Sequence, residues 1–314
     1  MSDRARVMAL HGGVLLALLA AHFVLPAYHH GNMARIMVLA SYAMGYNIVF
    51  GYTGLLSLGH ALLFAAGMYG MGLAVQHPGI GAGGALVIGT FAGGALAAAL
   101  GLLALRTTGV AFMIVTLMFA QAGYLSVLYF ADWTRGDEGF VIAHASRILW
   151  GIDLSDAGYR YLAAWVLFAL VLGACLWLVR APVGRSLIAI RENEPRLAML
   201  GYNTFRLKLM AMTVSGIIAG ASGAAYAVLF GYAGASFAGV EYSILPLLWV
   251  LLGGAGTALG PLIGTFFMFY LIDLSSGVTT AYMLIAGAAL VLLTLFAPQG
   301  MMGELRRRIW RWLP

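Results

Sequence analysis

The sequence predicts an all-α, polytopic integral membrane protein with about ten transmembrane helices. Of its 314 residues, 62% are hydrophobic and only 9% are charged, whereas an ordinary soluble domain has about 25% charged residues. Apolar windows of about 20 residues, the length that crosses a hydrocarbon core roughly 30 Å thick, recur along the whole chain. The polar gaps between them are short, so we expect residues 1–314 to form a single transmembrane domain.

The apolar windows give the expected spans in order. They fall at about 8–27, 36–50, 58–76, 84–105, 109–130, 160–179, 210–231, 243–256, 260–275 and 279–297. The windows between 36 and 76 and between 243 and 275 are short. The first window follows Arg4 and Arg6 and resembles a signal peptide. No small-x-small cleavage site follows it, so we expect an uncleaved first span.

The distribution of charge predicts how the chain is oriented in the membrane. With the N-terminus in the cytoplasm, Arg106, the segment 180–208 and the basic residues from Arg306 to Arg311 also lie inside. Most of the basic residues are then cytoplasmic, as the positive-inside rule requires. The net-acidic segment 131–159 lies outside. The net charge of +6 therefore reflects membrane orientation and does not indicate nucleic-acid binding, because spans separate the basic residues.

The 42 glycines predict close contacts between membrane helices, because small residues let two helix backbones approach each other. The G-x-x-x-G spacing occurs at Gly89 and Gly93, at Gly216 and Gly220, and in the run 256–264. That run belongs to GGAGTALGPLIG (253–264), whose glycines and Pro261 predict an interruption at membrane depth. Such a break requires backbone that is buried in protein or lines a cavity, so we expect this region to border a translocation pathway.

A second interruption is expected between 45 and 70, where polar side chains are concentrated. Polar groups in a membrane span usually face the protein interior. We therefore take Asn47, Ser57 and His60, with Gln121 in the fifth span, as candidate pathway residues. The alternative is that they form hydrogen bonds between helices, with Ser57 at the start of a new helix. Asp273 is the one acid well inside an apolar run, near the outer end of its span, which favours interfacial solvation over an ion site.

Several chemistries do not fit the sequence. The only lysine, Lys208, is not part of a phosphate-binding loop, so the chain is not expected to hydrolyse nucleotide or to bind a cofactor. The adjacent His29 and His30 have the wrong spacing for a metal site, and we assign no catalytic or metal-binding residue. Ser222 lies in a G-x-S-G string of the kind found in intramembrane proteases, but no histidine base follows it. An ion-coupled secondary transporter would need charged groups at mid-membrane.

Four stretches resemble the permease subunits of branched-chain amino acid ABC importers, and the M-type subunit in particular. They are GYTGLLSLGHALLFAAGMYG (51–70), LRTTGVAFMIVTLMFAQ (105–121), VGRSLIAIRENEPRLAMLGYNTFRLKLMAMTVSGIIAGASGAAYA (183–227) and LLGGAGTALGPLIGTFF (251–267). The resemblance implies an ABC importer permease fold in a bacterial inner membrane. It also implies a second permease subunit, two cytoplasmic ATPase subunits that bind the ATP, and a periplasmic binding protein. Relatives in the family move urea, short amides or other amino acids, so the substrate stays open.

The segment 180–208 predicts a docking element made of two short helices. Residues 182–191 place Val183, Leu187 and Ile190 on one face. Asn193 or Glu194 can cap a second helix, which would have Pro195 in its first turn and Gly201 at its end. The resemblance implies that residues 194–201 insert into a groove on an ATPase, although 195–197 depart from the small residues usual there. The implied coupling residues are Arg185, Arg191, Glu192, Glu194, Arg196 and Gly201.

Two further expectations concern the membrane and the outer loop. A basic loop such as 180–208 would also be attracted to anionic lipid headgroups, which is the alternative to ATPase docking. On the outer side, TRGDEGF (134–140) resembles the glycine-rich outer segment of the family, and the acidic loop 131–159 is expected to meet the periplasmic binding protein.

Overall fold

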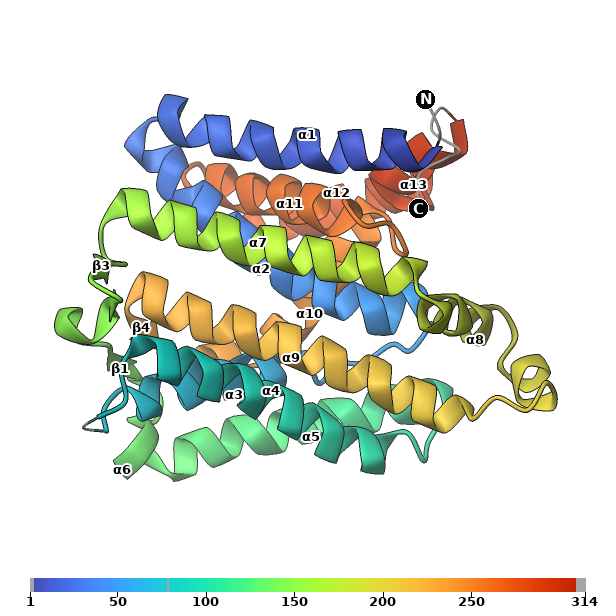
Figure 1. Ribbon diagram of the computed structural model, residues 1–314, viewed down its shortest axis with the longest axis horizontal. Helices are drawn as coiled ribbons and strands as arrows, with labels where there is room; N and C mark the ends of the chain where they lie inside the picture. The colour runs from blue at the N-terminus through green and yellow to red at the C-terminus, as the bar shows by residue number, and fades with distance from the viewer. Residues whose placement is uncertain (1–2, 78, 309–314) are drawn as a thin grey trace.

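The computed structural model describes residues 3–77 and 79–308 as a bundle of helices that run roughly along one direction (Figure 1). The first and last described residues lie at the end of the bundle that carries the helix α8, Pro182–Met199. The short strands and the helix α6, Ala131–Thr134, lie at the opposite end. The segments 180–208 and 131–159 are therefore at opposite ends of the bundle.

The other helices follow one another along the chain. They are α1 (Asp3–Val24), α2 (Ala27–Asn47), α3 (His60–Ala74), α4 (Ala82–Ala104), α5 (Gly109–Tyr129), α7 (Ala157–Arg180), α9 (Thr204–Phe230), α10 (Glu241–Gly253), α11 (Gly260–Ser276), α12 (Tyr282–Phe296) and α13 (Gly300–Arg308). A π-helix, η1 (Ile48–Tyr52), continues α2, and two 3-10 helices are η2 (His144–Arg147) and η3 (Ala235–Ala238). The mainly helical fold agrees with the expected class.

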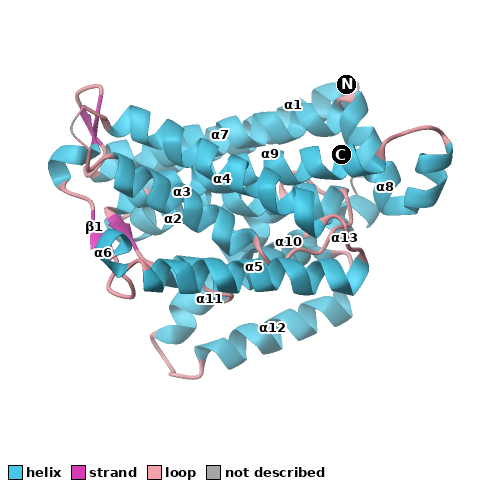
Figure 2. Ribbon diagram, turned by 90° about the horizontal axis from the view of Figure 1, so that it is seen from below, coloured by secondary structure: helices cyan, strands magenta, loops and turns pink. Residues whose placement is uncertain are grey.

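Four two-residue strands form two small antiparallel pairs (Figure 2). Strand β1 (Phe140–Val141) pairs with β4 (Tyr232–Ala233), with Phe140 opposite Ala233. Strand β2 (Ile148–Leu149) pairs with β3 (Ile152–Asp153). Beside them the Arg147 guanidinium donates to the carbonyls of Val228 and Leu229, at 2.7 and 2.6 Å. Arginine thus satisfies carbonyls that the end of α9 leaves without a helical partner.

Within residues 3–77 and 79–308, six helices are long and apolar enough to cross a membrane. They are α1, α2 with η1, α4, α5, α7 and α9, whereas α3, α10 and α11 are apolar but shorter. Polytopic membrane insertion follows from these helices, and the count of ten crossings stays a prediction. Arg311 of the expected C-terminal basic cluster lies outside the described residues.

Helix α2 begins at Ala27, well before the apolar window that starts at about 36. Its first turns are polar, so the sequence pattern alone indicates a gap. In the structure, polar side chains of these turns meet partners on other helices. The His30 ring stacks on Tyr161 with centroids 4.4 Å apart, and the guanidinium of Arg35 lies 5.1 Å from the ring centre of Phe230. Contacts with residues distant in the sequence therefore allow the polar residues before 36 to form the first turns of α2.

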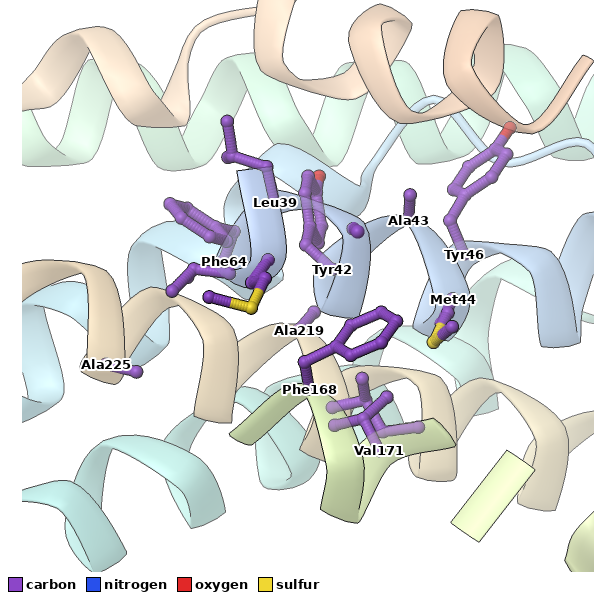
Figure 3. Close-up of a cluster of buried hydrophobic side chains, with 14 of the residues drawn as sticks. Leu39, Tyr42, Ala43, Met44, Tyr46, Phe64, Phe168, Val171, Ala219 and Ala225 are labelled. Carbon is purple, nitrogen blue, oxygen red and sulfur yellow. The ribbon is translucent and has the colours of Figure 1, made fainter. Parts of the chain in front are cut away.

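The core is built around α2, which is buried along most of its length. In Figure 3 the side chains of Leu39, Tyr42 and Tyr46 project from α2, with Phe64 of α3 and Phe168 of α7 packed around it. The rings of Tyr42 and Phe64 are 4.8 Å apart. Because the tyrosine hydroxyls are buried with the rings, they need partners. Tyr42 donates to the Tyr242 carbonyl at 2.8 Å, and Tyr46 donates to the Ser57 carbonyl at 3.0 Å.

Glycines bring α3, α4 and α9 into direct backbone contact, as the G-x-x-x-G spacings predict. A Cβ atom at Gly93 of α4 would lie 2.6 Å from the Gly216 carbonyl oxygen of α9, and one at Gly220 would lie 2.9 Å from the Cα of Gly93. A Cβ at Gly67 of α3 would overlap the Gly220 carbonyl. The three helices approach so closely that no larger side chain fits between them.

Replacing Gly67 with alanine should destabilise the isolated chain. The added methyl group must push α3 away from α9, and such overpacking typically costs about 1–3 kcal/mol. Gly173→Ala in α7 is the matched control, because its methyl group would meet no atom within 4 Å. Thermal unfolding in detergent should show a lower midpoint for Gly67→Ala and an unchanged or higher one for Gly173→Ala. Equal midpoints would contradict close packing at Gly67.

Candidate functional site

The two interruptions predicted from the sequence are present, and they contact each other. Helix α2 continues into the π-helix η1 and then into an irregular segment, residues 53–59, before α3 begins. Helix α10 ends at Gly253, and α11 begins at Gly260. The Asn47 side chain joins the two breaks. Its Nδ2 donates to the Thr257 carbonyl at 2.9 Å, and its Oδ1 accepts from the Gly256 N–H at 2.9 Å.

The second break depends on glycines in two ways. Gly254 and Gly256 have φ of +117° and +77°, a region that other residues rarely adopt. A Cβ at Gly253 would overlap the carbonyl of Gly260, so the ends of α10 and α11 are in backbone contact. Thr257, only 1% exposed, donates from its hydroxyl to the Gly254 carbonyl at 2.7 Å. Polar groups freed by the break are thus paired inside the protein, as a membrane environment demands.

Ser57 and His60 belong to a buried chain of hydrogen bonds between α3 and α9. The Ser215 hydroxyl donates to the Gly45 carbonyl at 2.7 Å, so toward His60 it can only accept. His60 therefore donates from Nε2 to Ser215 at 2.9 Å, which leaves Nδ1 to accept from the Ser57 hydroxyl at 3.1 Å. The imidazole is neutral in this arrangement. Nε2 joins α3 to α9, and Nδ1 binds the irregular segment just before α3. Hydrogen bonding of this kind is the alternative that the sequence left open.

Gln121 lies away from the other three candidate pathway residues. It is on an exposed face of α5, and α5 lies at the lower edge of the bundle in Figure 1 and in front of it in Figure 2. The structure thus brings Asn47, Ser57 and His60 into one buried region and separates Gln121 from them. An amide on an outer helix face suits contact with another subunit better than contact with hydrocarbon.

Ser222 and Asp273, which the sequence singles out, both have local partners. The Ser222 hydroxyl donates to the Ile218 carbonyl one helical turn earlier, at 2.9 Å, which supports a packing role. The carboxylate of Asp273 accepts from the Tyr28 hydroxyl and lies 3.4 Å from Nδ2 of Asn32. Both partners come from the first turns of α2, so Asp273 fastens the end of α11 to that helix.

Helix α8 consists of two short helices that meet at a kink, and it projects from the end of the bundle (Figure 1). The kink is at Asn193, with φ −161° and ψ 90°. Its Oδ1 accepts from the Arg196 N–H at 3.0 Å, so Asn193 is the cap of the second helix. Leu187 and Ile190 are buried against the bundle. Gly201 follows the second helix with φ +85°, which confirms the expected pair of short helices in the segment 180–208.

Two charged residues of this segment reach back to the bundle. Glu194 forms an ion pair with Lys208 of α9, with Nζ and Oε1 2.5 Å apart, and Lys208 is only 5% exposed. Arg191 donates from Nη1 to the Gly51 carbonyl of η1. The sequence indicated coupling residues in this segment, but it gave no sign of these partners. The partner of Glu194 is a lysine on the following helix, α9. The partner of Arg191 is a main-chain carbonyl 140 positions away in the sequence.

The other assigned coupling side chains, Arg185, Glu192 and Arg196, are exposed. Arg196 is on the second short helix, whereas Arg185 and Glu192 precede the kink, and Glu192 lines a cavity together with Gly51 and Gly256. Next to the segment lies a cavity of about 700 Å³, lined by Phe50, Ala255, Thr257 and arginines of α8 and α13. In α13, the Arg307 and Arg308 side chains hold the pKa of Glu304 below its usual range.

Comparison with known proteins places the chain in a family. Residues 31–295 match the family of the branched-chain amino acid transport system permease component. The chain belongs to this family. It is 27% identical over 296 residues to the high-affinity branched-chain amino acid transport system permease protein LivM of Escherichia coli, covering 87% of this chain and 69% of that protein.

Other relatives match shorter stretches. The autoinducer 2 import system permease protein LsrC of Photorhabdus laumondii is 29% identical over 153 residues, covering 46% of this chain and 43% of that protein. The probable LivM of Methanocaldococcus jannaschii is 30% identical over 111 residues, or 34% of this chain and 32% of that protein. No solved structure matches the chain significantly. The family is one of transport components of ABC importers and not of enzymes.

Replacing Asn47 with alanine should destabilise the chain by removing the bridge between the two breaks. The Gly256 N–H and the Thr257 carbonyl would lose their partner, at about 1–3 kcal/mol for each buried group left unpaired. Gln121→Ala is the matched amide control, because Gln121 is exposed. Thermal unfolding in detergent checks both variants. An Asn47→Ala protein as stable as the Gln121→Ala protein would contradict a structural bridge at Asn47.

Proposed function

We propose that this chain is the permease subunit of an ATP-driven importer that moves branched-chain or related hydrophobic amino acids from the periplasm to the cytoplasm. The match over residues 31–295 supports the class of substrate, as does the likeness to LivM along most of the chain. The observation that carries the mechanism is the kinked segment 180–208. It projects from the end of the bundle and bears exposed charges.

In this proposal the segment 180–208 is cytoplasmic and docks on one of two ATPase subunits, which bind and hydrolyse ATP. Both termini are cytoplasmic as well, and the end with the segment 131–159 faces the periplasmic binding protein. The charge distribution supports this orientation by the positive-inside rule. A second permease subunit completes the pathway, and this chain itself binds no cofactor, metal or nucleic acid.

Docking of the second short helix fits its geometry. Asn193 caps it, and Gly201 turns the chain back toward α9 with a positive φ. The second short helix therefore has defined ends. Its exposed Arg196 and the neighbouring exposed Glu192 carry charges of both signs. Complementary charges favour rapid and specific association with a partner. A purely lipid-binding loop would need neither the cap nor the turn.

The proposed function predicts ATP-dependent uptake only in the complete assembly. Proteoliposomes that contain this chain with its second permease and ATPases, supplied with the binding protein, should import labelled leucine. Unlabelled isoleucine and valine should compete, whereas urea, short amides and autoinducer 2 should not. The isolated chain should hydrolyse no ATP, because its sequence has no phosphate-binding loop. Full competition by urea or autoinducer 2 would overturn the substrate class, and ATP hydrolysis by the purified chain would overturn the subunit role.

The coupling role predicts a specific effect of Gly201→Val. A Cβ atom at Gly201 would meet no atom within 4 Å, so the substitution acts only through its φ of +85°. Forcing a β-branched residue into this region costs about 1–3 kcal/mol and should displace the second short helix. Copurification of the ATPase subunits and leucine uptake should both fall, while membrane insertion and pairing with the second permease should be retained.

The matched control is Gly201→Asn, because asparagine tolerates the left-handed region better than other side chains. This variant should keep more uptake than Gly201→Val. Normal ATPase copurification and normal uptake by Gly201→Val would show that the segment 180–208 is not the docking element, and attraction to lipid headgroups would then explain its basic residues.

A further inference from the structure

Arg191 occupies an unusual position among the charged residues of the segment 180–208. It lies at the end of the first short helix, two residues before the kink at Asn193. Although part of the residue is exposed to solvent, its side chain runs back to the bundle, where the guanidinium donates to the main-chain carbonyl of Gly51. Arg185, on the same short helix, is also exposed, so the hydrogen bond to Gly51 is what sets Arg191 apart.

The acceptor is a carbonyl that the local fold leaves free. The π-helix η1 ends at Tyr52, so the Gly51 carbonyl lies in its last turn, beyond the reach of later helical N–H groups. A buried carbonyl without a partner is costly, and a guanidinium is a strong donor for it. Arg191 therefore completes the hydrogen bonding of the first interruption from outside that interruption.

The guanidinium also touches the second interruption. A Cβ atom at Gly256, in the second interruption, would lie 3.0 Å from Nη1 of Arg191. In the first interruption, a Cβ atom at Gly54 would lie 3.0 Å from Cγ of Arg191. Both glycines have positive φ, +77° and +78°. Since Asn47 already joins the two breaks, the Arg191 side chain is held by a single unit made from both interrupted helices.

A second tie lies on the other side of the kink. Glu194 follows Asn193 and pairs with the buried Lys208 at the start of α9. The kink is thus fixed to the bundle at two points, one on the interrupted helices and one on a continuous helix. A displacement of residues 194–199 would pivot on the Lys208 tie and act on the interrupted helices through Arg191.

The surroundings leave room for such a displacement. The cavity of about 700 Å³ and a second of about 310 Å³ both border Arg191, and both include Ala255 from the second break. Backbone next to a cavity shifts at lower cost than backbone packed on all sides, because fewer contacts are lost. The second break can therefore respond to a pull at Arg191.

We propose that Arg191 is a positioning residue that transmits movement of the segment 180–208 to the two interrupted helices, and that it is not a contact for the ATPase. This inference rests on the proposed function, since the movement would come from ATPase subunits docked on the segment. It assigns the charges on the projecting part of the segment to docking and the Arg191 guanidinium to transmission.

The test measures how accessible the second break, between α10 and α11, is to a thiol reagent in the complete transporter. A cysteine is introduced by Ala255→Cys in a Cys175→Ala background, and its rate of maleimide labelling is measured with and without ATP and vanadate. In the parent transporter, the rate of maleimide labelling should change several-fold when ATP and vanadate trap the ATPase subunits. The change should be lost in Arg191→Ala and kept in the matched variant Arg106→Ala, which alters an exposed arginine outside the segment 180–208, while ATPase copurification stays normal in both. ATP hydrolysed per leucine imported should rise several-fold in Arg191→Ala alone.

Three results would contradict these expectations. A parent transporter whose labelling does not respond to trapping, or an equal response in all three proteins, overturns the inference. Loss of ATPase copurification in Arg191→Ala makes Arg191 a docking contact and overturns it as well. Failure of the parent chain to associate with any ATPase would instead contradict the proposed function.

A second variant covers the case in which Arg191→Ala does not fold. Arg191→Lys then replaces it, since one ammonium donor can still reach a carbonyl. Coupled uptake retained in part by Arg191→Lys supports transmission. Parallel loss of melting temperature, hydrolysis and uptake marks a merely structural role and overturns the inference.

Discussion

The main constraint on this molecule is that every main-chain polar group at membrane depth needs a partner within the protein. Two helices are interrupted, and each interruption frees N–H and carbonyl groups. Asn47 satisfies one of each in the second break, and Arg191 satisfies a carbonyl in the first. Loss of either side chain would leave buried polar groups unpaired, at about 1–3 kcal/mol for each. The polar residues near the breaks are therefore first of all what makes irregular backbone possible in a membrane.

Close packing of small residues supplies the rigid frame around the breaks. Helices α3, α4 and α9 meet through Gly67, Gly93 and Gly220, where backbone contacts backbone. Lipid is as apolar as the helix surfaces, so shape complementarity and not hydrophobic burial holds such helices together. Lys208 extends from one helix of this frame to Glu194. The same frame thus carries one of the two ties of the projecting segment, while the interrupted helices carry the other.

The sequence allowed prediction of those features that local chemistry determines. Glycine and proline spacing predicted the break at 253–264, and Asn193 with Gly201 predicted the ends of the second short helix. Contacts between distant parts of the chain could not be predicted in this way. The polar start of α2 indicated a gap because the partners of His30 and Arg35 lie on α7 and α9. Likewise, nothing local distinguishes Arg191, which reaches a carbonyl 140 positions away, from Arg185 on the same short helix.

The charged side chains of the segment 180–208 differ in whether they bind groups elsewhere in the chain. Arg185, Glu192 and Arg196 are exposed. Arg191, although exposed as well, and Glu194 bind groups within the chain. Exposed charges contribute little to the stability of the fold but strongly to association. Charges bound to the bundle fix the angle at which the segment leaves it. Under the proposed function, partner affinity and mechanical transmission would reside in different side chains of one short element, so that either could change without loss of the other.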